Sequence, residues 1–354
     1  MDADLPLRLE WRPFHFRLSR ELVTAHGALA EKRGWLLRLE AADGRLGWGE
    51  AAALRWGEQG GEPSEPLAEA RLALGSRLSR SELERRLPRL PRSLAFACGL
   101  ALAELDGRVG GAGGWLPAPV SALLLPAGEA MPEALEQALG PLSSPGPGGA
   151  SPLTCKWKVA AGDDRRERQL LEWLLERLPP AARLRLDANG GWDRSTAAAW
   201  ASRLASESRL DWLEQPLPPA DGEGLRQLVQ RVPVALDESL RSLESGSCQG
   251  AEAGGPFSNA PERPDWPGWL VRRPALEGDP RPLLAALQAG QPRLMLSTAL
   301  ETGIGMRLLA HLAALQQQGP TPTAPGLAPG WRPAGGLFDP DPALVWAAAG
   351  GEGP

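Results

Sequence analysis

The sequence predicts an α/β protein whose larger part is a parallel sheet closed into a barrel. Strand-like and helix-like segments alternate from residue 119 to residue 324, and this alternation favours parallel strands joined by crossover helices. The number of repeats calls for closure of the sheet into a barrel. An open, doubly wound sheet is the alternative, but no Gly-x-Gly-x-x-Gly follows an expected strand.

The first 118 residues come before this alternation and predict a separate α+β unit. The segment 34–40 has a strand-like pattern and the segment 42–45 predicts a turn, so we expect a small antiparallel sheet. From Pro66 the pattern becomes helical, and the apolar run 94–105 is suited to burial. The glycine-rich segment 107–114 predicts a loop or linker after this unit.

The barrel region is expected to repeat a short apolar strand followed by a helix. The strands are expected at 119–125, 154–159, 183–187, 210–214, 234–237, 269–273 and 293–297. The helices are expected near 132–139, 164–178, 194–206, 221–230, 280–289 and 303–317. The stretch 240–267 is rich in Gly, Pro, Ser and Glu where a further helix should lie, so we expect an irregular excursion there.

The composition indicates a small ligand. The formal net charge is −5 at pH 7, with 38 basic residues interspersed among 43 acidic ones, which argues against binding to nucleic acid or to an anionic membrane. No apolar run reaches the roughly 18 residues that span a bilayer, and the N-terminus has no signal-peptide pattern. We therefore expect a cytoplasmic protein, with its oligomeric state open.

Few residue types of this chain are candidates for acid–base chemistry or for binding a soft metal. The three cysteines, Cys98, Cys155 and Cys248, are odd in number and far apart, so a disulfide framework is not expected. The three histidines stand in no ligand spacing, so any bound metal should prefer oxygen ligands. Tyrosine is absent, and the candidate acid–base groups reduce to lysine and the carboxylates.

Lysine is rare in this chain, and its placement is informative. Only three of the 38 basic residues are lysine, and two of them, Lys156 and Lys158, are separated by one residue. Arginine stays protonated, whereas a desolvated lysine can have a pKa low enough for it to act as a base. The pair therefore indicates a chemical role for an amine.

Charged residues close successive expected strands of the barrel, where all such ends meet at one mouth. They are Lys156, Lys158, Asp187, Glu214, Asp237 and Arg273. The two-residue period of a strand puts both lysines on one face. Three carboxylates that converge repel each other unless a cation lies between them, so the sequence predicts a divalent metal. Oxygen ligands suit Mg²⁺, with Mn²⁺ as an alternative.

These residues lie in segments that resemble the enolase superfamily, in its muconate-lactonizing-like subgroup, and within it the o-succinylbenzoate synthase family. The segments are 155–159, 184–192, 212–217, 235–239, 271–274 and 296–305. The resemblance implies a modified TIM barrel, (β/α)7β, at 119–324. It also implies an α+β capping domain at 1–118 that is completed by the C-terminal segment 325–354.

The resemblance also implies a reaction and its site. Asp187, Glu214 and Asp237 would hold Mg²⁺, and Lys158 would be the base. Lys156 would lower the pKa of Lys158 and help hold the substrate carboxylate. The reaction would be dehydration of 2-succinyl-6-hydroxy-2,4-cyclohexadiene-1-carboxylate to o-succinylbenzoate, in menaquinone or phylloquinone synthesis.

Arg273 departs from this pattern, because the superfamily usually carries a second catalytic lysine there. A racemase needs a base on each face of the carbanion, and a guanidinium serves badly as a base. A one-base dehydration needs only a fixed cation over the intermediate, which arginine supplies. Arg273 therefore favours the dehydratase. The alternatives are an N-succinylamino acid racemase, a dipeptide epimerase, a muconate cycloisomerase, or a barrel that binds a metabolite without catalysis.

Five further residues are weaker candidates for substrate contact or for support of the site. Asn189 and Glu238 stand beside expected metal ligands, although polar residues at strand ends are often turn formers. Ser297 and Glu301 follow the last expected strand, and Glu301 could equally be a helix N-terminal acid. His26 lies in a capping-domain segment that resembles the substrate-covering loop of the superfamily.

Overall fold

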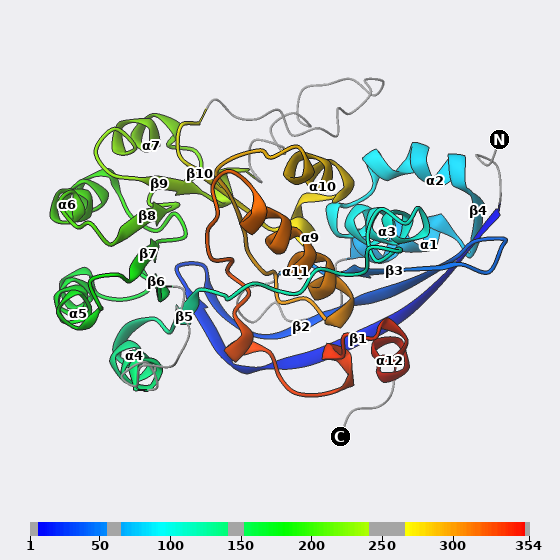
Figure 1. The fold of residues 1–354 in the computed structure, drawn as a ribbon, viewed down its shortest axis with the longest axis horizontal. Helices are drawn as coiled ribbons and strands as arrows, with labels where there is room; N and C mark the ends of the chain where they lie inside the picture. Colours follow the sequence, from blue (N-terminus) through cyan, green and yellow to red (C-terminus); the bar gives the residue numbers. More distant parts are fainter. Residues whose placement is uncertain (1–5, 55–64, 141–151, 241–265, 351–354) are drawn as a thin grey trace.

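The described part of the chain forms two sheets, one antiparallel and one parallel (Figure 1). The computed structural model describes residues 6–54, 65–140, 152–240 and 266–350. Cys248 and most of the expected excursion at 240–267 lie outside these ranges. Among the described residues, no helix is long and apolar enough to cross a membrane.

The antiparallel sheet is built on a long hairpin. Its strands are β1 (Pro6–Thr24), β2 (Gly27–Glu40), β3 (Leu46–Ala51) and β4 (Arg77–Ser79), in the order β3-β2-β1-β4. The helices of this part are α1 (Glu65–Leu74), α2 (Arg80–Arg86), the 3₁₀ turn η1 (Leu87–Arg89) and α3 (Arg92–Leu105). The expected α+β character of the N-terminal part is therefore present.

The buried helix α3 lies directly against β3. A Cβ on Gly47 would come within 2.1 Å of the carbonyl oxygen of Ala101, and a Cβ on Gly49 within 2.2 Å of that of Ala97. Glycine is required at both positions because the two backbones approach so closely. This close contact fixes the strand that carries Glu50 against the helix.

Strand β1 was missed by the sequence patterns. Its buried residues change phase: Leu7 and Leu9 lie on odd positions, whereas Phe14, Phe16 and Leu18 lie on even ones. Leu7 and Leu9 pack under the cap helices, and the three later residues pack in the larger core that includes the barrel. One strand thus serves two cores, and this hides its two-residue period.

The parallel sheet has seven strands within the described residues, ordered β11-β10-β9-β8-β7-β6-β5. They are β5 (Leu123–Leu125), β6 (Thr154–Lys158), β7 (Arg183–Asp187), β8 (Leu210–Glu214), β9 (Val234–Leu236), β10 (Trp269–Arg272) and β11 (Leu294–Leu296). Each lies within a range expected from the sequence. Each strand lies beside the next strand along the chain, as in a parallel sheet that closes into a barrel.

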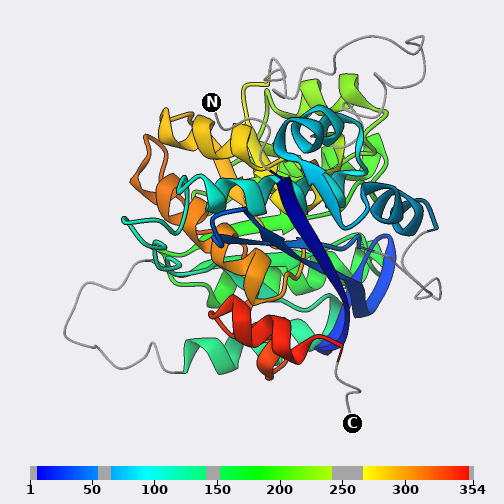
Figure 2. The same cartoon turned by 90° about the vertical axis from the view of Figure 1, so that its right-hand side faces the viewer.

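Helices cover the outside of this sheet (Figures 1 and 2). These helices and 3₁₀ turns are η2 (Gly128–Ala130), α4 (Met131–Leu139), α5 (Asp164–Arg177), α6 (Arg194–Leu204), α7 (Gly222–Leu228), α9 (Pro274–Glu277), α10 (Arg281–Gln288) and α11 (Gly303–Gln318). The last elements, η4 (Pro329–Trp331), η5 (Gly336–Phe338) and α12 (Pro342–Ala348), lie on the side of β1 instead. The short helix α9 was not expected, because it begins at Pro274, directly after an expected strand. The α/β barrel fold with an N-terminal cap is confirmed.

The two edges of the parallel sheet are joined by a segment near Gly326. Ser297, just after β11, forms a parallel bridge with Gly326. The amide of Ala122, just before β5, donates to the carbonyl of Pro325 at 2.8 Å. This segment lies just past residue 324, so we propose that it closes the barrel before the chain returns to the cap.

Candidate active site

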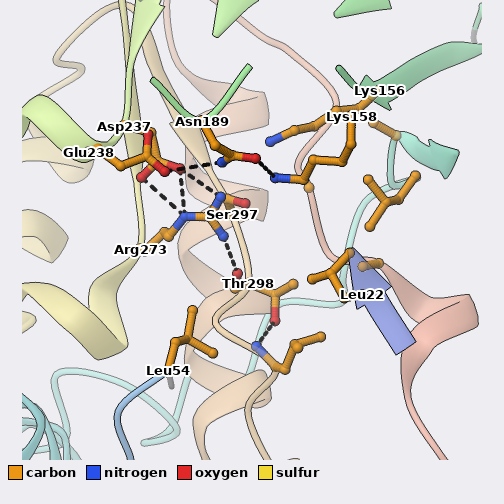
Figure 3. A pocket seen from close by; sticks show the side chains of 15 residues that line it. Leu22, Leu54, Lys156, Lys158, Asn189, Asp237, Glu238, Arg273, Ser297 and Thr298 are labelled. Carbon is orange, nitrogen blue, oxygen red and sulfur yellow. Dashed lines mark hydrogen bonds and ion pairs between the residues drawn. The ribbon is translucent and has the colours of Figure 1, made fainter. Parts of the chain in front are cut away.

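Four of the charged residues expected at the strand ends line one pocket (Figure 3): Lys156, Lys158, Asp237 and Arg273. Asp187 and Glu214 do not line it, but they form ion pairs with its lysines. Lys156 and Lys158 are on β6, Asp187 ends β7 and Glu214 ends β8. Asp237 follows β9 by one residue, and Arg273 follows β10 by one residue. Lys158 pairs in register with Asp187, which pairs with Glu214. Successive parallel strands therefore bring these side chains to one end of the sheet.

The two lysines are buried against the carboxylates. Lys156 forms ion pairs with Asp187, at 2.8 Å, and with Glu214. The amine of Lys158 lies 2.6 Å from the carboxylate of Asp187 and donates to the side-chain oxygen of Asn189 at 3.0 Å. Both lysines are only 5% exposed. Their amines are therefore held by hydrogen bonds and do not extend freely into solvent.

Arg273 is fixed on the other side of the pocket. Its guanidinium donates to the Asp237 carboxylate from Nε at 2.9 Å and from Nη2 at 2.7 Å. Its Nη1 donates to the carbonyl oxygen of Thr298 at 2.6 Å. Charge-assisted bonds in this forked geometry orient a guanidinium strongly. Arg273 is therefore a fixed cation, although here it is bound to an expected metal ligand.

The pKa values of the two lysines shift in opposite directions. Burial lowers the pKa of Lys158, and the charges of Lys156 and Arg273 lower it further against the opposing effect of Asp187. Burial also acts to lower the pKa of Lys156, but the carboxylates of Asp187 and Glu214 outweigh burial and raise it. Lys158 is thus the amine better suited to act as a base.

The pKa of Glu214 is raised by its burial and by the neighbouring carboxylates. Burial raises its pKa to about 7, and the negative charges of Asp187 and Asp237 also act to raise it. Glu214 is 0% exposed, so water does not screen this repulsion. A cation among the three carboxylates would relieve it.

The donor set fits a hard divalent cation in its chemistry. Asp187, Glu214 and Asp237 offer only oxygen atoms, which Mg²⁺ prefers. Within the described part of the chain, no group of three or more histidine, cysteine or acidic side chains is arranged to hold a metal. The carboxylates are instead joined through Lys156 and Arg273. Metal binding therefore requires these cations to yield some of their carboxylate contacts.

The sequence patterns missed the apolar wall of the pocket. This wall contains Leu22 from β1 and Leu54 after β3, together with Leu300 in the loop after β11. Leu124 of β5 also lines the pocket. The sequence does not identify these leucines, because a leucine that lines a pocket has the same sequence pattern as a leucine in the core. The pocket thus has one apolar wall, contributed partly by the cap, and one charged wall.

The five weaker candidates occupy different places. Asn189, Glu238 and Ser297 line the pocket, and Asn189 also donates to Glu238 at 3.1 Å. Glu301 does not line it: its carboxylate accepts from Thr298 Oγ1 and from the amide of Ala299, inside the loop after β11. His26 lies in the turn between β1 and β2, with Nε2 3.7 Å from the Glu238 carboxylate.

Two buried polar side chains hold the loops that carry the site. Glu167 of α5 accepts hydrogen bonds from the amides of three successive residues after β6, at 2.8 to 3.0 Å. Gln215, after β8, accepts from the amides of Asp237 and Ser239 at 3.1 and 3.0 Å. These hydrogen bonds hold the backbone of both loops, at partly buried amides after β6 and at buried amides after β9. Neither residue was expected from sequence.

Comparison with known proteins places this architecture in a family. The model of the family described as enolase C-terminal domain-like matches residues 153–246. An o-succinylbenzoate synthase from Thermosynechococcus vestitus is 35% identical over 319 residues, which cover 86% of this chain and 88% of the relative.

Solved structures agree with this match. The o-succinylbenzoate synthase of Thermosynechococcus elongatus BP-1, complexed with Mg in the active site, is 31% identical with a TM-score of 0.69. The match covers 94% of this chain and 96% of that one. A dipeptide epimerase from Enterococcus faecalis V583, with a TM-score of 0.66, is 19% identical over 90% of each chain and shares the fold. The chain belongs to the o-succinylbenzoate synthase family of the enolase superfamily.

Proposed function

We propose that this protein is an o-succinylbenzoate synthase that removes water from 2-succinyl-6-hydroxy-2,4-cyclohexadiene-1-carboxylate. The observation that supports this most strongly is the asymmetry of the pocket. One buried lysine of lowered pKa, Lys158, faces it from β6, whereas the fixed charge at β10 is an arginine. One base and one permanent cation suit a dehydration on a single face of the ring.

Lys158 moves the proton in this proposal. Its neutral amine takes the proton from the ring carbon that bears the carboxylate. The ammonium that results then gives this proton to the departing hydroxyl on the neighbouring carbon, so the C–O bond breaks and water leaves. The ring becomes aromatic, and Lys158 returns to its neutral form. Asn189 and Asp187 would orient the amine through the contacts that they already make with it.

A magnesium ion, held by Asp187, Glu214 and Asp237, would supply positive charge to the substrate carboxylate as the carbon loses its proton. Mn²⁺ is the alternative ion. Lys156 lies among the same carboxylates and would help hold the substrate carboxylate. Its charge also lowers the pKa of Lys158.

Arg273 would stabilise the negative charge that spreads over the ring. It cannot accept a proton at ordinary pH, because a guanidinium stays protonated. Burial acts to lower its pKa, but Asp237 and Glu214 outweigh burial and raise it. The apolar wall of Leu22, Leu54 and Leu300 would pack against the uncharged part of the substrate.

The test is the loss of cyclohexadiene absorbance when purified protein meets this substrate, with Mg²⁺, with Mn²⁺ and with EDTA. Rapid loss that EDTA abolishes is expected. If the substrate is stable, α-proton exchange into D₂O on both isomers of an N-succinyl amino acid would indicate a racemase. Calorimetric binding without turnover would indicate a metabolite-binding barrel.

We also propose that the protein works in the cytoplasm, in menaquinone or phylloquinone synthesis. Cys98 and Cys155 are buried and unpaired, and thiols persist in a reducing compartment. The test uses a strain of a bacterium, or of an organism with plastids, that lacks its own synthase. Expression of this chain should restore its quinone, and failure of an active enzyme to do so would contradict the proposed pathway.

A further inference from the structure

The third lysine of the chain, Lys32, joins the cap to the barrel. It lies on β2 and is 3% exposed. Its amine donates to the carbonyl oxygens of Ala299 and Leu300, at 2.8 and 3.1 Å, and to the carboxylate of Glu50 at 3.3 Å. The sequence separation to these carbonyls is 267 and 268 residues. A buried charge in such a place needs all three contacts.

Glu50, the partner of Lys32, holds the start of α11. Its other carboxylate oxygen accepts from the amide and the hydroxyl of Thr302, at 2.9 and 2.6 Å, and from the amide of Gly305 at 3.3 Å. Thr302 is the N-cap of α11. Lys32 and Glu50 together thus fix both the loop after β11 and the helix that follows it.

The loop held by Lys32 forms part of the pocket. Thr298 and Leu300 line the pocket, and the Thr298 carbonyl accepts the hydrogen bond from Arg273. Leu300 has φ of 62°, a left-handed conformation that is unfavourable for this residue. Such a conformation persists only where the surrounding contacts impose it, and Lys32 contacts the carbonyl of this residue directly.

We propose that Lys32 is a positioning residue for the reaction. It holds the loop after β11 in the conformation that anchors Arg273 at Thr298 and places Leu300 in the pocket wall. This inference rests on the proposed function. It also makes docking of the cap a condition for a complete active site, because Lys32 and Glu50 come from the cap sheet.

The geometry explains why position 32 is a lysine in a chain whose basic residues are mostly arginine. An ammonium offers three donors in a compact tetrahedral group, and Lys32 uses them on two carbonyls and one carboxylate. The planar fork of a guanidinium suits one carboxylate and does not match this arrangement. Lys32→Arg should therefore keep the charge and lose the positioning.

Hydrogen exchange of the free protein tests the loop directly. Lys32→Met and Lys32→Arg should speed exchange in a peptide that covers 297–305 by about tenfold, and leave peptides from β6 to β8 unchanged. The control is Glu84→Gln, which breaks the ion pair of α2 with Arg281 of α10, another contact between cap and barrel. Unchanged exchange at 297–305, or equal acceleration everywhere, would overturn the proposal.

A double-mutant cycle tests the link to catalysis. Lys32→Arg should lower kcat/KM by about tenfold or more in the parent, because small misplacements of catalytic groups are costly. The loss should shrink to under about threefold in an Arg273→Lys background, where the anchor at Thr298 is already disturbed. A merely structural role would give equal losses in both backgrounds, and Glu84→Gln should give none in either.

The two proposals can fail separately. If the parent protein does not turn over the cyclohexadiene substrate, the proposed function fails. The exchange experiment still decides whether Lys32 positions the loop, because it needs no substrate. If the parent is active and Lys32→Arg has the same hydrogen exchange at 297–305 and the same kcat/KM as the parent, only the positioning role of Lys32 is wrong.

Discussion

At the scale of single residues, two lysines of similar burial have different electrostatic surroundings. Lys156 lies between two carboxylates, whereas Lys158 has one carboxylate and an amide as partners. This difference explains why the pKa of Lys156 is raised and that of Lys158 is lowered. One residue type thus supplies both a fixed charge and a titratable base.

The first prediction concerns the pH dependence of kcat/KM, which reports the ionisation of the free enzyme. Lys158 must be neutral to take a proton, so the rate should rise with pH through its pKa, which lies below the ordinary value of 10.5. Lys156→Met removes a positive neighbour and should move this limb to higher pH. A pH profile that is the same in both proteins would contradict the assignment of Lys158.

The second prediction concerns the metal. Asp237→Asn removes a charged oxygen ligand and should weaken Mg²⁺ binding by about tenfold or more, since changes even to residues that only support ligands commonly cost that much. Calorimetry with Mg²⁺ measures the affinity. Asp221→Asn, at the start of α7, removes an equal charge away from the pocket and is the control. Equal affinities for both variants would exclude Asp237 as a ligand.

The candidate site could be predicted from sequence where charged residues recur at successive strand ends. Lys158, Asp187 and Glu214 are adjacent because their strands pair in register, and strand ends are visible in sequence. Lys32 and Leu22 could not be predicted in this way. Their places depend on how the cap docks on the barrel, which leaves no local pattern.

At the scale of elements, the loop after β6 is held by one carboxylate. Glu167 accepts from the amides of Ala160, Ala161 and Gly162, and Ala160 has a left-handed φ of 58°. These residues directly follow the strand that carries both lysines. The clamp therefore links the stability of this loop to the position of the base.

The third prediction is that Glu167→Ala destabilises the protein by about 1 to 3 kcal/mol, because it leaves three partly buried amides without their acceptor. Urea unfolding measures the change. Glu176→Ala, on the exposed face of the same helix, should change stability by less than about 0.5 kcal/mol. Similar costs for the two substitutions would show that the clamp contributes little.

The elements themselves differ in how well the sequence predicts them. The strands and major helices of the barrel lie within or close to their expected ranges, because one unit repeats. Strand β1 was missed because its buried side changes after Pro13. The closing segment at Gly326 was missed because a single bridge gives no periodic signal.

At the scale of the whole molecule, the pocket is complete only when cap and barrel are joined. The barrel supplies the charged wall, and the cap supplies Leu22, Leu54 and the Lys32–Glu50 pair. In the proposed reaction the barrel side chains would perform the chemistry, and the cap side chains would enclose the substrate.

The central claim is that one lysine performs the dehydration, and turnover by Lys158→Ala tests it most directly. The decrease of cyclohexadiene absorbance would be followed with Mg²⁺ present, and circular dichroism would verify that the variant is folded. Loss of about 10³-fold or more in kcat is predicted, since the variant has no group to move the proton. Turnover by a folded Lys158→Ala protein at the parent rate would contradict the mechanism.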